Sequence, residues 1–213
     1  GDMRFCSYSH HTSFARATAQ EFLANANKAL EEAAEFFRNC NKVIITLGTS
    51  WCYRHIQSDM IVSNCLKHPA AEYDREFLPA SQTADILTEI MNLSNGSDHC
   101  ITPKEFIFTV SPIRHFKDGA HGNQISKASL LVGIDQVLNA KAVCKADYFP
   151  SYEIMMDELR DYRFYAEDMC HPTLQAVNYI RERFLTWALP ASEHSLLEEN
   201  IKSFKRQSHI SLQ

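Results

Sequence analysis

The apolar residues of this chain recur at two different spacings. Over Ser13–Asn39, Ser81–Asn95 and Gln124–Lys141 they recur every three to four positions, which predicts amphipathic helices. We expect Ser81 to cap the second helix. In the third, we expect an inward face of Ile125, Ala128, Leu131, Val132 and Leu138. A last core helix should follow Pro172, with an apolar stripe of Leu174, Val177, Ile180, Phe184 and Trp187.

Short continuous apolar runs predict strands instead. Val43–Leu47 is such a run, and we expect it to be a central strand that is buried on both faces. Phe106–Val110 is a second run, and Asp147–Phe149 resembles the end of a third strand. Residues 52–80 alternate weakly around polar breaks, which predicts a small excursion with a β-hairpin.

Strand and helix therefore alternate along the chain, which favours an α/β fold with a doubly wound, mainly parallel sheet. A length of 213 residues is enough for one full core and short for two domains. We predict a single α/β domain over residues 1–213, with a peripheral C-terminal helix within 191–213.

Charge and composition exclude several classes of function. A net charge of −5 without a long basic run argues against nucleic acid as a partner. No apolar stretch reaches the ~20 residues of a membrane span. The seven cysteines form no C-x-x-C pair, and His10-His11 has no carboxylate or cysteine at useful spacing, so we expect no metal and no cofactor. Reduced thiols and a cytoplasmic location are the expectation.

Two polar clusters should meet at the carboxyl ends of the strands, where doubly wound sheets bind ligands. One is Gly48-Thr49-Ser50: Gly48 allows close approach of a substrate, and its backbone N–H or the Ser50 hydroxyl is a candidate oxyanion donor. The alternative is an ordinary tight turn.

The other cluster is Arg114-His115, which follows the second strand and suits a ligand with a carboxylate or phosphate. An internal salt bridge from Arg114 to Asp118 or Glu153 is the alternative.

The loop before the last core helix carries Asp168 and His171, followed by Pro172. A serine hydrolase needs an imidazole to accept the hydroxyl proton and a carboxylate to fix its tautomer. Pro172 suits the first turn of the following helix. The alternative is that Asp168 caps that helix and His171 is a surface residue. Ser126-Lys127 is a weaker candidate for a nucleophile pair, because neighbours on a helix point apart.

A resemblance to a known family extends this interpretation. Over about residues 5–188 the chain resembles the GSCFA family, which is similar in turn to the SGNH (GDSL-like) hydrolases. The strings that carry the resemblance are Ser9-His-His-Thr-Ser-Phe14, Ile44-Ile-Thr-Leu-Gly-Thr49, Val62-Ser-Asn-Cys65, Lys67-His-Pro69, Thr109-Val-Ser-Pro-Ile-Arg-His115, Asp118-Gly119, Ser126-Lys127, Tyr148-Phe-Pro-Ser-Tyr-Glu153, Asp157-Glu-Leu-Arg-Asp-Tyr-Arg163 and Asp168-Met-Cys-His-Pro172.

The resemblance implies a three-layer α/β/α, flavodoxin-like fold and a role for each matching residue. Asp168 and His171 match the block that supplies acid and base. Gly48-Thr49 matches the start of the superfamily's G-x-N-D block, in which the Asn donates to the oxyanion. Here Ser50 replaces that Asn and Trp51 replaces the Asp, which leaves a side-chain oxyanion donor in question.

The Gly-Ser-Cys-Phe-Ala string that carries the family's nucleophile is absent from these residues. We therefore expect an ester hydrolase for acyl or acetyl groups, such as a carbohydrate-linked ester, whose serine lies outside this chain. The chain alone should be inactive. The alternative is a non-catalytic binding or interaction domain that keeps the cleft. In either case it is expected to pair with its own missing N-terminal segment or with a second chain.

Overall fold

The computed structural model describes residues 4–96, 102–140 and 144–210. The chain divides into two compact units. The first comprises Gly1–Ser111 and His115–Pro150, and the second comprises Pro112–Arg114 and Ser151–Gln213. The predicted end of one helix at Lys141, and one of the seven cysteines, Cys100, lie outside the described residues.

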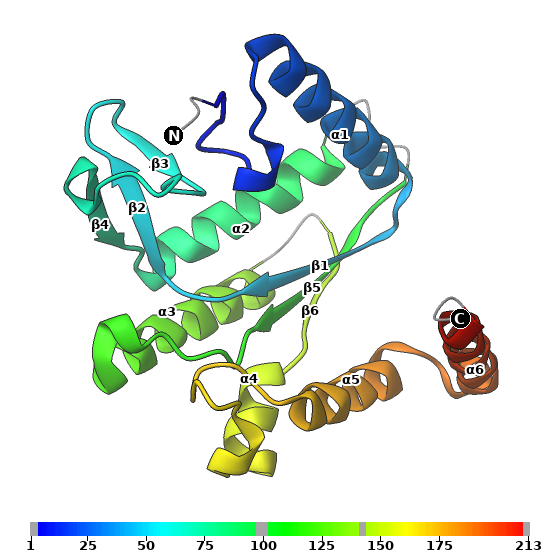
Figure 1. Ribbon diagram of the computed structural model, residues 1–213. Helices are drawn as coiled ribbons and strands as arrows, with labels where there is room; N and C mark the ends of the chain where they lie inside the picture. Colours follow the sequence, from blue (N-terminus) through cyan, green and yellow to red (C-terminus); the bar gives the residue numbers. More distant parts are fainter. Residues whose placement is uncertain (1–3, 97–101, 141–143, 211–213) are drawn as a thin grey trace. The chain divides into compact units, whose positions relative to one another are not determined.

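A parallel three-stranded sheet organises the first unit (Figure 1). Its order is β1 (Lys42–Leu47), β5 (Glu105–Val110) and β6 (Ala146–Tyr148), with Lys42 in register with Glu105 and Phe106 with Ala146. All three predicted strands are therefore confirmed, and the chain is an α/β protein.

The prediction that Val43–Leu47 is central and buried was wrong. In the described sheet β1 is an edge strand, and its residues alternate between exposed and half-buried. The central strand is β5, in which Phe106, Phe108 and Val110 have no exposed surface. An apolar run alone does not distinguish the two positions, because both suit β-branched residues.

A second sheet is antiparallel, in the order β3-β2-β4. It comprises β2 (Trp51–His55), β3 (Met60–Val62) and β4 (Tyr73–Phe77), and a short 3₁₀ turn, η2 (Ala70–Glu72), precedes β4. The predicted hairpin excursion over 52–80 is thus a three-stranded sheet. The extra strand β4 was missed because its centre is polar.

Three helices of the first unit correspond to the predicted ones, with different starts. Helix α1 (Ala19–Asn39) begins after Thr18, whose hydroxyl accepts from the N–H of Glu21, and the residues around Ser13 form only a 3₁₀ turn, η1 (Thr12–Phe14). Helix α2 (Ala80–Asn95) begins directly after Pro79, so Ser81 lies inside the helix rather than at its cap.

Helix α3 (Gly119–Asn139) follows another 3₁₀ turn, η3 (Phe116–Asp118), and starts five residues before the predicted position. Its predicted inward face was also wrong, since Ile125 and Val132 are about half exposed. The buried face instead comprises Ser126, Lys127, Ser129, Leu130, Gly133, Ile134 and Val137. Small residues on this face let α3 lie close to α2 (Figure 1).

The second unit is helical. Its elements are α4 (Ser151–Glu153), a π-helical stretch η4 (Ile154–Leu159), η5 (Tyr162–Phe164), α5 (Leu174–Ala188), η6 (Ala191–Glu193) and α6 (His194–Ile210). A small core joins η4, η5 and α5, formed by Met155, Phe164, Tyr165 and Ala176 with Leu159 and Ile180 at its margin. Leu174 of the predicted stripe is 76% exposed, so the stripe is buried only in part.

Across residues 4–96, 102–140 and 144–210, no helix combines the length and apolarity needed to cross a membrane. The single domain over 1–213, with its peripheral C-terminal helix, stays a prediction.

Candidate functional site

The loop between η5 and α5 is tightly bonded to itself. Its two arms are joined by bonds from the Thr173 N–H to the Phe164 carbonyl and from the Ala166 N–H to the His171 carbonyl, each 2.8 Å, and Tyr165 forms a β-bridge with Pro172. The turn at the tip places Met169 at a φ of 57°. This loop holds Asp168 and His171 in a defined conformation.

Within the loop, Asp168 and His171 form the predicted pair. Nδ1 of His171 lies 2.5 Å from Oδ2 of Asp168, while Oδ1 accepts from the backbone N–H groups of Cys170 and His171 at 2.9 and 3.0 Å. The backbone bond from His171, its side-chain bond and the Cys170 bond together lower the pKa of Asp168 to about 2.

The carboxylate therefore stays ionised and favours a proton on Nδ1 of His171, which leaves Nε2 as the basic nitrogen. The His171 side chain is 62% exposed. Among the described residues of its unit, none hydrogen-bonds Nε2.

The alternative role of Asp168 as the cap of the last helix is wrong. Helix α5 is capped by Thr173, whose hydroxyl accepts from the Ala176 N–H at 3.3 Å. Pro172 accordingly lies before the cap and not in the first helical turn. The carboxylate of Asp168 is bonded to the loop itself, which is the arrangement that an oriented base requires.

Arg114 belongs to the same unit as this loop. Its backbone N–H donates to the carbonyl of Cys170 at 3.1 Å, and its guanidinium lies 4.2 Å from the ring centre of Tyr165 and 5.3 Å from that of Tyr162. The pKa of Arg114 is raised: burial opposes the shift, and bonds to Tyr162 and Tyr165 outweigh it. The segment Pro112–Arg114 is thereby attached to the Asp168 loop.

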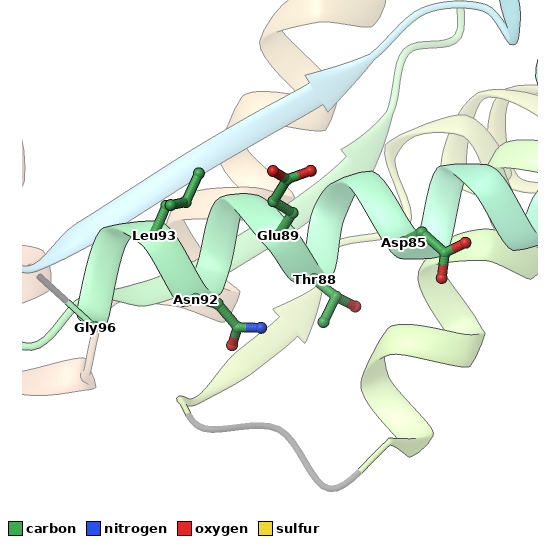
Figure 2. Close-up of a pocket in the computed structure, with 6 residues that line it drawn as sticks. All are labelled: Asp85, Thr88, Glu89, Asn92, Leu93 and Gly96. Atoms are coloured by element: carbon green, nitrogen blue, oxygen red, sulfur yellow. The ribbon is translucent and has the colours of Figure 1, made fainter.

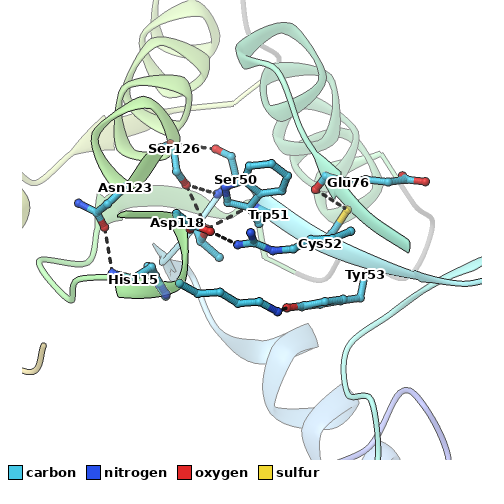
Figure 3. Close-up of polar contacts among 12 residues, drawn as sticks. Ser50, Trp51, Cys52, Tyr53, Glu76, His115, Asp118, Asn123 and Ser126 are labelled. Carbon is cyan, nitrogen blue, oxygen red and sulfur yellow. Dashed lines mark hydrogen bonds and ion pairs between the residues drawn. The ribbon is translucent and has the colours of Figure 1, made fainter. Parts of the chain in front are cut away.

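The other predicted residues lie in the first unit, where helix α3 holds the Gly48–Ser50 segment (Figure 3). The Ser126 hydroxyl accepts from the Ser50 N–H at 2.8 Å and lies 3.0 Å from the Thr49 hydroxyl, and the Ser50 hydroxyl donates to the Ser126 carbonyl at 2.9 Å. Lys127 donates to the Gly48 carbonyl at 2.6 Å.

These bonds limit what Ser50 and Ser126 can do. Both side chains are 1% exposed. The Ser50 hydroxyl proton is already committed to the Ser126 carbonyl, so in this conformation it does not donate to a ligand. Burial likewise keeps Ser126 from reaching a substrate as a nucleophile.

His115 lies close to Gly48, since a Cβ at Gly48 would be 3.8 Å from Nε2 of His115. Its backbone N–H donates to Oδ1 of Asn123 at 3.0 Å (Figure 3). The pKa of His115 is lowered, first by burial and then by the charge of Lys127, so the ring is neutral near pH 7. Asp118 forms its ion pair with Arg75.

Sequence reasoning missed the role of the Ser126-Lys127 pair. The argument that adjacent residues on a helix point apart was used to discount the pair as a nucleophile and base. It did not anticipate that the Gly48–Ser50 segment would cross α3 closely enough for both to bond it. The available signal was a run of small or polar residues, Ser126, Ser129 and Gly133, at helical spacing.

A hollow of about 450 Å³ lies elsewhere, along α2 (Figure 2). It is lined by Asp85, Thr88, Glu89, Asn92, Leu93 and Gly96, all from one helix face and its end. None of the predicted site residues borders it. In the described residues, no group of three or more His, Cys, Asp or Glu side chains is arranged to hold a metal ion.

Comparison with known protein families gives one match. The GSCFA family profile matches residues 1–184 of the 213. No curated protein matches the chain, and no solved structure does. This match covers most of the chain, and the chain therefore belongs to the GSCFA family.

Proposed function

We propose that this protein is an ester hydrolase of SGNH type, with His171 as its general base. The Asp168–His171 pair is the observation that carries the proposal: the carboxylate is 2.5 Å from Nδ1 and the ring is exposed. The three-layer α/β/α, SGNH-like arrangement is part of the proposal and is supported by the family membership and the parallel sheet.

In the proposed reaction, a serine hydroxyl attacks the ester carbonyl and its proton passes to Nε2 of His171. Asp168 stabilises the imidazolium that forms. His171 then returns the proton to the departing alcohol oxygen, leaving an acyl-enzyme. Water hydrolyses this intermediate by the same proton route in reverse. The superfamily motif assigns oxyanion donation to the Asn that Ser50 replaces. Because the Ser50 hydroxyl is engaged, the proposed donor is the backbone N–H of Gly48.

The serine is proposed to lie on a segment outside this chain, and the free edge of β1 supports that idea. In a flavodoxin-like sheet of order 2-1-3-4-5, the observed run β1-β5-β6 corresponds to strands 3-4-5. The missing first strand would then pair with β1, where Ile44 is now 54% exposed. A second chain that supplies the same strand is the variant of this proposal.

The proposed substrate is a small-molecule ester on a polar carrier, such as an acetylated sugar. Arg114 and His115 are the proposed substrate-binding residues, and neither suits a long acyl chain. We do not propose a nucleic acid or a membrane as a partner, nor a metal or cofactor for the reaction. A cytoplasmic location is part of the same proposal.

A binding domain without catalysis is the second candidate, and one observation favours it. Ser50 stands where the superfamily's oxyanion Asn would be, and its hydroxyl bonds Ser126 instead. Loss of one oxyanion donor typically costs about 10²- to 10³-fold in rate. A protein that kept only the cleft would tolerate this replacement.

The test is hydrolysis of 4-nitrophenyl acetate and of an acetylated hexose by a protein that carries the proposed upstream segment. We expect His171→Ala to lower kcat/KM at least about 1,000-fold, because loss of a triad histidine removes both proton transfers. Equal rates for the two proteins, or no hydrolysis by either, would reject the hydrolase in favour of the binding domain.

His68→Ala is the matched control. His68 is also an exposed histidine paired with a carboxylate, with Nδ1 3.0 Å from Oε2 of Glu72. It lies outside the proposed machinery, so its removal should leave the rate within about twofold. A loss as large as that of His171→Ala would show that the effect is not specific to the Asp168 loop.

A further inference from the structure

Two lysines of the first unit are almost fully buried, and they bind opposite ends of the same pair of strands. Lys127 is 1% exposed and donates to the carbonyls of Gly48 and Ser111 at 2.6 and 2.7 Å, just beyond the carboxyl ends of β1 and β5. Lys104 is 2% exposed and lies at the amino ends. It donates to the carbonyls of Arg38, Cys40 and Thr102 at 3.2–3.3 Å.

A buried ammonium that connects two strands has a high cost in desolvation free energy. Moving it out of water costs several kcal/mol, which carbonyl dipoles offset only in part, and an apolar side chain of similar volume would fill the same space. This desolvation cost is best explained where the orientation of the bound carbonyls has a function. At the carboxyl ends of the strands, the orientation of the Gly48 carbonyl determines the conformation of the Gly48–Ser50 segment.

We propose that Lys127 is a positioning residue, which sets the orientation of the Gly48–Thr49 peptide by holding the Gly48 carbonyl against that of Ser111. A peptide group is planar and trans, so fixing the carbonyl of Gly48 also fixes the direction of the Thr49 N–H on its other side. The catalytic consequence of this inference rests on the proposed function, whereas the orientation of the segment does not.

Ser126 completes the arrangement from the preceding position of α3. It bonds the Ser50 N–H and contacts the Thr49 hydroxyl, so that three consecutive residues are attached to one helical dipeptide. Gly48 has no side chain, so only its backbone carbonyl is available for this attachment. Removal of the Lys127 ammonium would therefore release Gly48 first, while Ser126 continued to hold Ser50.

The first arm of the test is backbone NMR of this chain with Lys127→Met, which keeps the length of the side chain and removes the ammonium. We expect the carbonyl ¹³C signals of Gly48 and Ser111 and the Thr49 amide signal to move, and amide exchange around Gly48 to rise at least about tenfold. Signals of the β5 core should stay in place. Unchanged Gly48 and Thr49 signals would overturn the inference, whatever the protein's activity.

Lys104→Met is the matched control, because it removes an equally buried ammonium from the other end of the same strands. It should disturb the Arg38 and Cys40 carbonyls and leave Gly48 and Thr49 unaffected. If both variants moved the Gly48 signals equally, Lys127 would be a general brace of the sheet and the positioning role would be rejected. Where Lys127→Met fails to fold, the Ser111 and Gly48 signals in Lys127→Leu, which also removes the ammonium, decide between the same outcomes.

The second arm is steady-state hydrolysis by the protein with its proposed upstream segment. The proposed oxyanion donor, the Gly48 N–H, belongs to the residue whose carbonyl Lys127 holds, so its position depends on that contact. Misplacement of a transition-state group by about 1 Å costs up to about 10²-fold, and we therefore expect Lys127→Met to lower kcat by about 10- to 100-fold with KM within twofold. Lys104→Met should retain kcat. Absence of hydrolysis by the unmodified protein would refute the proposed function and leave the NMR result to decide the orientation of Gly48.

Discussion

At the scale of single residues, Asp168 is held by hydrogen bonds to both of its carboxylate oxygens. These oxygens accept three hydrogen bonds from the two residues that follow Met169, namely the backbone N–H groups of Cys170 and His171 and the imidazole of His171. The His171 pairing could be predicted from the D-x-x-H spacing. The backbone bonds could not, because they depend on the left-handed turn at Met169.

This bonding predicts how the Asp168 carboxyl titrates. We expect an NMR midpoint near pH 2 in the unmodified chain, compared with 3.8 for an ordinary aspartate. The folded-state pKa is lowered, so the stabilising contribution is fully present above pH 3.8 and is lost as the pH falls through about 2. In His171→Ala the midpoint should rise but remain below 3.8, because both backbone N–H donors are still in place. A midpoint near 4 in the unmodified chain would contradict this account of the loop.

At the scale of secondary-structure elements, the contact of α2 with α3 depends on a missing side chain. A Cβ at Gly133 would lie 2.8 Å from Cβ of Thr83 and 2.9 Å from the carbonyl oxygen of Ala80. Both distances are far inside van der Waals contact, and the carbonyl belongs to the first turn of α2. Relief would require α2 and α3 to move apart.

Gly133→Ala should therefore destabilise the protein, although alanine is the better helix former by about 1 kcal/mol. Overpacking of this kind costs about 1–3 kcal/mol, and after the gain in helix propensity we expect a net loss of up to about 2 kcal/mol in urea unfolding followed by circular dichroism. Val132→Ala, one position earlier and about half exposed, is the comparison and should change stability by less than about 1 kcal/mol. A stabilised Gly133→Ala would show that the two helices are not in close contact.

The same elements explain which parts of the fold were predictable. The runs that form β1 and β5 were recognisable because short continuous apolar segments are typical of strands. The face of α3 was predicted incorrectly, because apolar periodicity assumes that large side chains face the core, and here Ser126 and Gly133 do. Strand β4 was missed since Asp74, Arg75 and Glu76 look like a loop. Arg75 and Glu76 form ion pairs with Asp118 and Arg54.

At the scale of the whole molecule, family membership and local geometry provide separate parts of the support for the proposed function. The GSCFA match over residues 1–184 names a family without assigning a reaction to this chain. The Asp168 loop holds a histidine that is oriented by a carboxylate, and β1 is an edge strand of the described sheet. The proposed hydrolase combines these features with a serine from outside the chain.

The most direct test of the central claim, that His171 is the base for a serine nucleophile, is labelling with a fluorophosphonate, which phosphonylates an activated serine in preference to other side chains. In the protein that carries the upstream segment, we predict a single labelled serine by peptide mass spectrometry. Labelling should slow at least about 1,000-fold in His171→Ala and stay unchanged in His68→Ala. No labelled serine in the unmodified protein, or labelling at the same rate without His171, would contradict the account.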